Sequence, residues 1–462
     1  MMKVTAIFDI GKTNKKFFLF DENYQEVFKT YSHFEEIEDE DGFPADDLAA
    51  IQDWIKTIFH QILQNKAYQV EAVNFSTYGA SFVHIDQKGQ PVAPLYNYTK
   101  PYSDDILQSF YDKYGSALKI AKETASPPLQ MLNAGLQLYW LKYAKPQIFN
   151  KIRWSLHLPQ YISFLFTGIP VSDYTSIGCH TMLWDFEKKD YHDWVYAEEI
   201  DKILPPIISA NTSINKNYDG QIIKMGIGIH DSSAALLPYL QADKKPFLLI
   251  STGTWSISLN PYKEEILTEE DLLLDCLNYM RIDGKPVKAA RLFLGNEYRI
   301  QVEKLCTHFG KAYGYHRKIK FDKALYHRLK LNELPHFHFE SINLPRTQPE
   351  MTRLDVFENF KTAFHQLMIE LVELQVQSVE RAIGDTPIQK IYIDGGFADN
   401  DIYLQLLKRH FTNYTLYTAK SPLGSALGAA MMLSDRVINK EFLKNNYALK
   451  KLTLAKLIAK NG

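Results

Sequence analysis

The feature that most constrains the fold is an apolar run near the start of the chain that ends in a carboxylate, turns through a glycine and resumes. The carboxylate is Asp9, the polar turn is 11–14, and the second apolar run begins at Phe17. Both runs are short and rich in β-branched or aromatic residues, so the stretch suits a β-hairpin. The familiar phosphate-binding loops join a strand to a helix, whereas here a strand follows the glycine. A nucleotide bound at this turn therefore implies a different fold.

The turn after Asp9 is rich in groups that bind anions. Backbone N–H groups, a hydroxyl, an amide and ammonium groups stand close together in Gly11, Lys12, Thr13, Asn14, Lys15 and Lys16. Donors of these kinds suit phosphate oxygens. Asp9 suits a Mg²⁺ ion held through water, because magnesium keeps much of its hydration shell. Taken alone, the stretch also fits an ordinary surface hairpin whose lysines face solvent.

A second stretch of the same shape stands roughly half a chain later. An apolar run from Phe247 ends at a turn built on Gly253, and another apolar run starts at Ser256. Two such hairpins predict a duplicated architecture with one phosphate-facing turn in each half. A cleft between the halves would then bind one ligand from both sides.

Two further segments carry residues suited to a nucleotide and to proton transfer. The strand expected at 388–393 is followed by Gly395 and Gly396 and then by a helix. Glycines let a nucleotide lie against the backbone, and a helix N-terminus adds free N–H groups. Asp231 precedes a run of small residues and is expected at a helix start, which tends to keep a carboxylate ionised. Its other common use at such a position is as an N-cap.

These motifs, in this order, resemble the FGGY family of carbohydrate kinases. They are the hairpin at Asp9, the segment 228–235, the turn 251–255 and the segment 394–400. The resemblance implies an α/β chain of two lobes with the duplicated ribonuclease H-like fold of actin, Hsp70 and sugar kinases. A nucleotide and sugar cleft would lie between the lobes. ATP and Mg²⁺ are the implied cofactors, and transfer of the γ-phosphate to a sugar hydroxyl is the implied reaction.

The same resemblance implies roles for individual residues. Asp231 is the expected general base for the sugar hydroxyl, and Asp9 is the expected metal-binding residue. The implied nucleotide-binding residues are Gly11, Thr13, Asn14, Lys16, Thr252, Gly253, Thr254, Gly395, Gly396 and Asn400. The implied sugar-binding residues are His230, Gly79, Ala80, Gln137 and Thr175. Many relatives have a small residue or threonine at the position of Lys12, which leaves open whether that side chain touches the γ-phosphate or points outward.

Composition and segment boundaries give the organisation of the chain. We place a lobe boundary in the polar segment 241–246, which divides the chain into a sugar-binding lobe (1–243), a nucleotide-binding lobe (244–438) and a helical tail (439–462). A net charge of −2 gives no indication of the basic surface that binding to nucleic acid requires. Three scattered cysteines and the lack of a long apolar run favour a cytoplasmic protein without a membrane partner. Sugar and ATP are the expected partners, with a homodimer as a family-level expectation.

The choice of sugar follows from three matches within the family. The context of Gln137, the His230–Asp231 pair and the segment 251–256 are most similar to rhamnulokinase members. Those members carry carboxylates where Ser76 and Ser81 stand, which predicts a changed set of hydrogen bonds to the sugar. We expect a ketose kinase for L-rhamnulose or another deoxyketose at O1, with L-fuculose or a pentulose such as xylulose or ribulose as the alternative. A chaperone or filament ATPase of the same superfamily and a non-catalytic sugar sensor are the rival classes.

Overall fold

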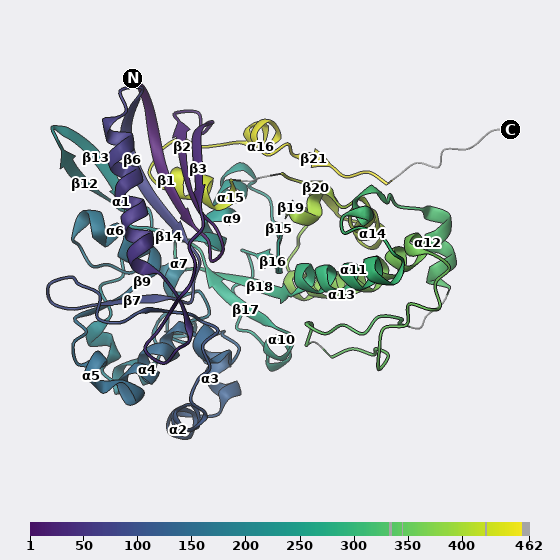
Figure 1. The fold of residues 1–462 in the computed structure, drawn as a ribbon, viewed down its shortest axis with the longest axis horizontal. Helices are drawn as coiled ribbons and strands as arrows, with labels where there is room; N and C mark the ends of the chain where they lie inside the picture. The colour runs from purple at the N-terminus through teal and green to yellow at the C-terminus, as the bar shows by residue number, and fades with distance from the viewer. Residues whose placement is uncertain (332–334, 344, 421–422, 455–462) are drawn as a thin grey trace.

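The computed structural model describes residues 1–331, 335–343, 345–420 and 423–454, which form two lobes that each contain a seven-stranded sheet (Figure 1). In the N-terminal lobe the sheet order is β12-β13-β6-β1-β2-β3, with β14 beside β6. The central strand β1 is antiparallel to β2 and parallel to β6. The strands are β1 (Met2–Ile10), β2 (Lys15–Asp21), β3 (Glu26–Ser32), β6 (Tyr68–Thr77), β12 (Ser213–Tyr218), β13 (Gln221–Gly226) and β14 (Ile229–His230).

The sheet of the C-terminal lobe repeats this arrangement. Its order is β17-β18-β16-β15-β19-β20-β21, and its central strand β15 is antiparallel to β16 and parallel to β19. The strands are β15 (Phe247–Thr252), β16 (Ser256–Asn260), β17 (Cys276–Met280), β18 (Pro286–Leu292), β19 (Lys390–Gly395), β20 (Thr415–Thr418) and β21 (Lys450–Lys451). The predicted duplicated two-lobed fold is therefore confirmed.

Both predicted hairpins are present, one in each lobe. Asp9 pairs with Lys16 across β1 and β2, and the turn closes where Gly11 N donates to Asn14 O at 3.0 Å. In the second hairpin Thr252 pairs with Ser256, and Gly253 N donates to Trp255 O at 2.7 Å. In each lobe the turn joins the central strand to its antiparallel neighbour, and the parallel strand lies on the other side of the central strand. The two turns therefore occupy equivalent positions in the two sheets.

A long amphipathic helix covers one face of each sheet. In the N-terminal lobe, α1 (Leu48–Gln64) buries apolar side chains at helical spacing, namely Leu48, Ile51, Ile55, Phe59 and Ile62. They join one apolar core with strand residues such as Phe8 and Phe75. In the C-terminal lobe, α13 (Phe360–Ile383) packs on β16 and β18. Apolar burial of this kind is the main source of stability in each lobe.

Two helices of small residues cross between the sheets, α9 (Asp231–Ala242) and α15 (Gly424–Met431). Although α15 belongs to the C-terminal half, it packs on β1 and β6 of the N-terminal sheet (Figure 1). The Tyr239 ring of α9 instead packs against Phe247 and Tyr392 of the C-terminal sheet. The two helices are in contact at Gly428 of α15 and Ala234 of α9, because a Cβ on Gly428 would lie 1.9 Å from Ala234 O. Both halves of the chain therefore contribute a helix to the region between the lobes.

The remaining elements surround these two layers. Those before the second hairpin are β4 (Ile37–Glu38), β5 (Pro44–Asp46), β7 (Phe82–Ile85), β8 (Leu95–Tyr96), α2 (Asp104–Tyr114), α3 (Ala117–Glu123), η1 (Gln130–Leu132), α4 (Ala134–Ala144), α5 (Pro146–Phe149), β9 (Trp154–His157), α6 (Leu158–Thr167), α7 (Tyr174–Ile177), β10 (Trp184–Asp185), β11 (Asp190–Tyr191), α8 (Asp193–Ala197) and η2 (Ile200–Ile203). Those after it are α10 (Glu269–Leu273), α11 (Leu294–His308), η3 (Tyr315–Lys318), α12 (Lys323–Lys330), η4 (Gly396–Asp399), α14 (Asp401–His410) and α16 (Lys440–Asn446).

The C-terminal tail differs from the single helix that the sequence predicts. After α16 the chain forms β21, whose Lys451 pairs with Tyr417 of β20. Residues 455–462 of that expected helix lie outside the described residues. Within the described ranges, none of the helices combines the length and the apolar character needed to cross a membrane.

Candidate active site

Two cavities meet between the lobes. The first, of about 760 Å³, is lined from both halves of the chain and contains the expected site residues Thr13, Gly79, Ala80, His230, Asp231 and Thr254. The second, of about 620 Å³, belongs to the C-terminal lobe and contains Gly253, Thr254, Gly396 and Asn400. Because Thr254 lines both cavities, the two cavities lie next to each other. We call them the acceptor cavity and the nucleotide cavity.

Asp231 opens α9 at the wall of the acceptor cavity, where 35% of its side-chain surface remains accessible. Its Oδ1 accepts a hydrogen bond from Ser232 Oγ at 3.2 Å. Burial between the lobes raises the pKa of Asp231 to about 6, although Ser232 and the charge of Lys16 act in the opposite direction. A carboxylate with that pKa is ionised at neutral pH and still basic enough to accept a proton from a reacting group.

His230 precedes Asp231 and also lines the acceptor cavity. Its peptide N–H donates to Thr175 Oγ1 at 3.1 Å, and its Nε2 lies 3.2 Å from both Asp231 Oδ1 and Cys179 Sγ. Burial lowers the pKa of His230 to about 4, so the imidazole is neutral at neutral pH. A neutral ring can donate one hydrogen bond and accept another, which suits contact with a polar uncharged ligand.

Asp9 lies at the end of β1, almost fully buried. Its Oδ1 accepts from Ser425 Oγ at 2.8 Å, and its Oδ2 lies 3.5 Å from Lys16 Nζ. Burial raises the pKa of Asp9, and the negative charge of Asp231 raises it further. Two carboxylates that repel each other in this way fit a divalent cation bound mostly through water. The described residues hold no cluster of three or more His, Cys, Asp or Glu side chains that would bind a metal directly.

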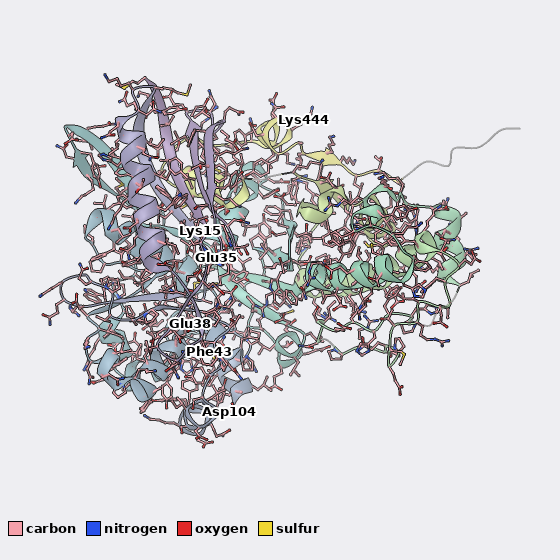
Figure 2. All side chains as sticks on the ribbon, in the orientation of Figure 1. Lys15, Glu35, Glu38, Phe43, Asp104 and Lys444 are labelled. Carbon is pink, nitrogen blue, oxygen red and sulfur yellow. The ribbon has the colours of Figure 1, made fainter. Side chains whose placement is uncertain are left out.

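The other two lysines of the first turn have different surroundings. Lys15 is buried, burial lowers its pKa, and its Nζ donates to the carbonyl oxygen of Lys12 at 2.9 Å. The expectation that Lys15 offers its ammonium group to an anion is therefore wrong. Lys12 lines the acceptor cavity, but its Nζ lies 2.6 Å from Asp46 Oδ2 and 3.1 Å from Glu36 Oε1. Figure 2 shows Lys15 and Glu35 near the end of the N-terminal sheet where the first hairpin turns.

The expected nucleotide-binding glycines in and beside the nucleotide cavity differ in how much space the protein leaves around them. Gly395 has a φ of +90°, and a Cβ there would lie 1.9 Å from Thr252 O, so the fold itself requires this glycine. A Cβ on Gly253 or Gly396 would meet nothing closer than 3.9 Å and 4.0 Å, respectively. Protein packing therefore does not explain these two glycines, whereas close approach of a ligand to the backbone does.

Two other expected nucleotide residues have their polar groups engaged within the protein. Thr252 Oγ1 donates to Asp394 O at 2.6 Å and accepts from Phe397 N at 3.0 Å. Asn400 lines the nucleotide cavity, and its Oδ1 caps α14 by accepting from Tyr403 N at 3.1 Å. Thr252 thus joins β15 to the turn after β19 and does not line either cavity, which corrects the expectation of a direct phosphate contact.

Two expected sugar contacts also lie behind the cavity wall. Gln137 is buried, and its Nε2 donates to Ala80 O at 2.9 Å and to Met131 O at 2.7 Å. Thr175 Oγ1 donates to Asp173 Oδ2 at 2.5 Å and accepts from His230 N. Neither the Gln137 nor the Thr175 side chain lines the acceptor cavity. These hydrogen bonds instead position the loops that line it. Both expectations of direct sugar contact are corrected in this way.

The loop between β6 and β7 does reach the acceptor cavity. Gly79 and Ala80 line it, Ala80 has a φ of +58°, and a Cβ on Gly79 would lie 2.3 Å from Cys179 Sγ. Ser76, in β6, and Ser81, at the end of this loop, are buried and do not line the cavity. Carboxylate side chains at these positions would extend further than the serines do, so the expected change in hydrogen bonds to the sugar stays a prediction.

Several cavity residues were not assigned a role from the sequence. They come from both lobes, and those of the C-terminal lobe include Trp255, Tyr279, Arg291 and Phe293. Arg291 was detectable in principle, because it is the one charged residue in the apolar run 289–294. His180 also lines the cavity and has its Nδ1 3.1 Å from Leu132 O.

Family models cover nearly all of this architecture. The N-terminal domain model of the FGGY family of carbohydrate kinases matches residues 4–236. The C-terminal domain model of carbohydrate kinase FGGY matches residues 244–441. The chain therefore belongs to the FGGY family of carbohydrate kinases.

Individual relatives are more distant. The chain is 25% identical over 194 residues to a rhamnulokinase of Halalkalibacterium halodurans, covering 40% of this chain and 41% of the relative. It is 24% identical over 223 residues to a rhamnulokinase of Oceanobacillus iheyensis, covering 44% and 45%. The chain thus matches less than half the length of these curated relatives.

Solved structures show the same fold across the whole chain. A carbohydrate kinase from Novosphingobium aromaticivorans aligns with a TM-score of 0.79 at 20% identity, over 98% of this chain and 94% of that one. A xylulose kinase from Rhodospirillum rubrum aligns with a TM-score of 0.78 at 14% identity, over the same two fractions. Identities this low establish the fold alone.

Proposed function

We propose that the protein is an ATP-dependent carbohydrate kinase that transfers the γ-phosphate to a ketose, with L-rhamnulose or a related deoxyketose phosphorylated at O1. The observation that carries this proposal is the position of Asp231. This carboxylate lines a cavity built from both lobes that adjoins a second cavity with open glycines. Phosphoryl transfer needs this combination of a base, an acceptor site and a phosphate site in contact.

In the proposed reaction Asp231 accepts the proton of the sugar hydroxyl as that oxygen attacks the γ-phosphate. Lys16 and the backbone N–H groups of the residues that follow Gly11 and Gly253 in the two turns donate to phosphate oxygens from opposite lobes. His230 orients the acceptor through a neutral hydrogen bond. A bound Mg²⁺ would neutralise charge on the phosphates, and Asp9 would hold it through water.

The choice of a deoxyketose rests on sequence similarity to rhamnulokinases and on the His230–Asp231 pair. Ser76 and Ser81 stand where rhamnulokinases carry carboxylates, so other ketoses must be compared with L-rhamnulose. L-Fuculose and the pentuloses xylulose and ribulose differ from it in stereochemistry or in length, and they are the natural comparison substrates.

The test is an ADP-release assay with L-rhamnulose, L-fuculose, D-xylulose, L-ribulose and glycerol, followed by phosphorus NMR of the product. We expect ketose-dependent ADP release and an O1-phosphate. ADP release that is independent of sugar would indicate a non-kinase ATPase. Ketose binding without ADP release would indicate a sugar sensor.

A matched pair of variants assigns the activity to this site. Asp231→Asn should lower sugar-dependent ADP release at least about 100-fold and leave ATP binding intact. Asp193→Asn is the control, because Asp193 also opens a helix but is exposed at the surface. Sugar-dependent activity in Asp231→Asn within about tenfold of that of the unchanged enzyme would contradict the assignment of the base.

A further inference from the structure

Arg291, the second residue from the end of β18, forms part of the C-terminal wall of the acceptor cavity. Only 6% of its surface is exposed. Its Nη2 donates to Asp275 Oδ1 at 2.6 Å, and its guanidinium carbon lies 5.0 Å from the centre of the Trp255 ring. The ion pair and the ring hold a planar cation at one place on the cavity wall.

The guanidinium of Arg291 has more donors than the protein satisfies. An arginine carries five N–H groups, and its side chain remains charged in proteins. Asp275 accepts from Nη2, whereas Nη1 has no acceptor among the described residues and is not one of the fully enclosed unpartnered atoms. A guanidinium N–H on the cavity wall that the protein leaves unpaired can donate to an oxygen of a ligand in the cavity.

Polar groups beside Asp231 line the same cavity as Arg291. His230 Nε2 lies 3.2 Å from Asp231 Oδ1 and 3.2 Å from Cys179 Sγ, which in turn lies 3.5 Å from His180 Nε2. The charge of Arg291 adds to burial in lowering the pKa of His180 to about 3. The row His230, Cys179, His180 therefore starts at the base and runs along the wall of the cavity that Arg291 also lines.

The charge balance at Arg291 indicates the kind of oxygen that it binds. Asp275 neutralises the guanidinium, and burial raises the pKa of Asp275. Asp231 adds a negative charge on the same cavity. An anionic acceptor would therefore meet a cation already paired and a repelling carboxylate. A hydroxyl or carbonyl oxygen can accept from the guanidinium without these costs.

We propose that Arg291 determines specificity for an uncharged polyhydroxy acceptor by donating to an oxygen at the end of the sugar remote from the hydroxyl at Asp231. This inference rests on the proposed kinase function. It assigns to the C-terminal lobe a direct contact with the sugar, so that the acceptor is bound by both lobes.

The test uses variants that keep the wall packed. Arg291→Lys retains the charge but loses the planar donor set, and the double variant Arg291→Met with Asp275→Asn removes both charges together. For the acceptor with the highest kcat/KM in the screen, both should raise the acceptor KM about 10- to 100-fold. The KM for ATP should stay unchanged. Arg281→Lys is the control, because Arg281 follows β17 on the same hairpin, pairs with Asp283 and lines neither cavity.

Substrate analogues identify the oxygen and test the charge argument. A deoxy analogue without the contacted oxygen should have the same KM with the unchanged enzyme and with both Arg291 variants. Asp275→Asn alone removes the carboxylate that neutralises the guanidinium of Arg291. An aldonate with the same number of carbons as the acceptor sugar should therefore inhibit this variant more strongly than the unchanged enzyme. Thermal melting of the apo proteins shows whether each variant is folded.

The outcomes separate this inference from the proposed function. If the unchanged enzyme phosphorylates none of the acceptors, the proposed function fails and this inference fails with it. If it phosphorylates one, and the folded Arg291 variants keep the acceptor KM of the unchanged enzyme, the kinase assignment stands and the role of Arg291 is overturned. A KM increase of the same size in Arg281→Lys would also overturn it.

Discussion

Ser425 Oγ donates a hydrogen bond to Asp9 Oδ1 at 2.8 Å, and so joins the start of α15 to the end of β1 across 416 residues of sequence. Burial raises the pKa of Asp9, while the hydrogen bond from Ser425 favours its ionised form. The carboxylate that we assign to magnesium is therefore positioned by both ends of the fold. This contact is possible because α15 packs on the N-terminal sheet.

The first prediction concerns this hydrogen bond. Ser425→Ala should raise the pKa of Asp9 further, because it removes a group that stabilises the carboxylate. We expect the Mg²⁺ concentration for half-maximal activity to increase about 10-fold at neutral pH, with little change in the sugar KM. Steady-state activity against Mg²⁺ concentration measures this. Ser109→Ala is the control, since Ser109 Oγ bonds only within its own exposed helix; an equal response in both variants would contradict the prediction.

The second prediction concerns pH. The pKa of Asp231 is raised to about 6, so its basic form predominates above that pH and is lost below it. We expect kcat/KM for the sugar to decrease tenfold per pH unit below about pH 6, with ATP affinity changing less. In Asp231→Asn the remaining activity should be lower by about 100- to 10,000-fold and should lack this acid limb. An acid limb that persists in this variant would assign the titration to another group.

The third prediction contrasts adjacent glycines after β19. Gly396→Ala places a Cβ in the nucleotide cavity where the protein leaves room, so we expect the KM for ATP to rise about 5- to 100-fold with the melting temperature unchanged. Gly395→Ala should mainly lower the melting temperature, because its φ is +90° and its Cβ would meet Thr252 O. Calorimetry with ATP and thermal melting of both variants separate the effects. Unchanged ATP affinity in Gly396→Ala would show that the nucleotide does not approach this backbone.

The fourth prediction concerns the crossing of α9 and α15. Gly428→Ala would bring a Cβ within 1.9 Å of the backbone oxygen of Ala234, which cannot move without shifting α9. Overpacking of this kind costs about 1–3 kcal/mol, which outweighs the gain of about 1 kcal/mol from replacing a glycine in a helix. Chemical denaturation measures the loss. Gly253→Ala is the control for stability, because its Cβ has space; a stable Gly428→Ala would mean that the helices separate easily.

The local pattern of the sequence was sufficient to predict the two hairpins and the strand–glycine–glycine segment after residue 388. Each of these depends on alternation, helical spacing or turn residues within a short stretch, so neighbouring residues determine it. The order of the motifs along the chain was then enough to predict a duplicated two-lobed fold. Asp231 was singled out because its position and neighbours match a family motif.

The tertiary structure alone decided which side chains face the cavities. Thr252 hydrogen bonds to Asp394, 142 residues away, and Gln137 to Ala80, 57 residues away, so their polar groups point into the protein. Arg291 became a cavity residue because β18 lies beside β16 and presents that face to the cleft. A residue type shows what hydrogen bonds a side chain can make. The partner that it selects depends on long-range packing, which no short stretch of sequence contains.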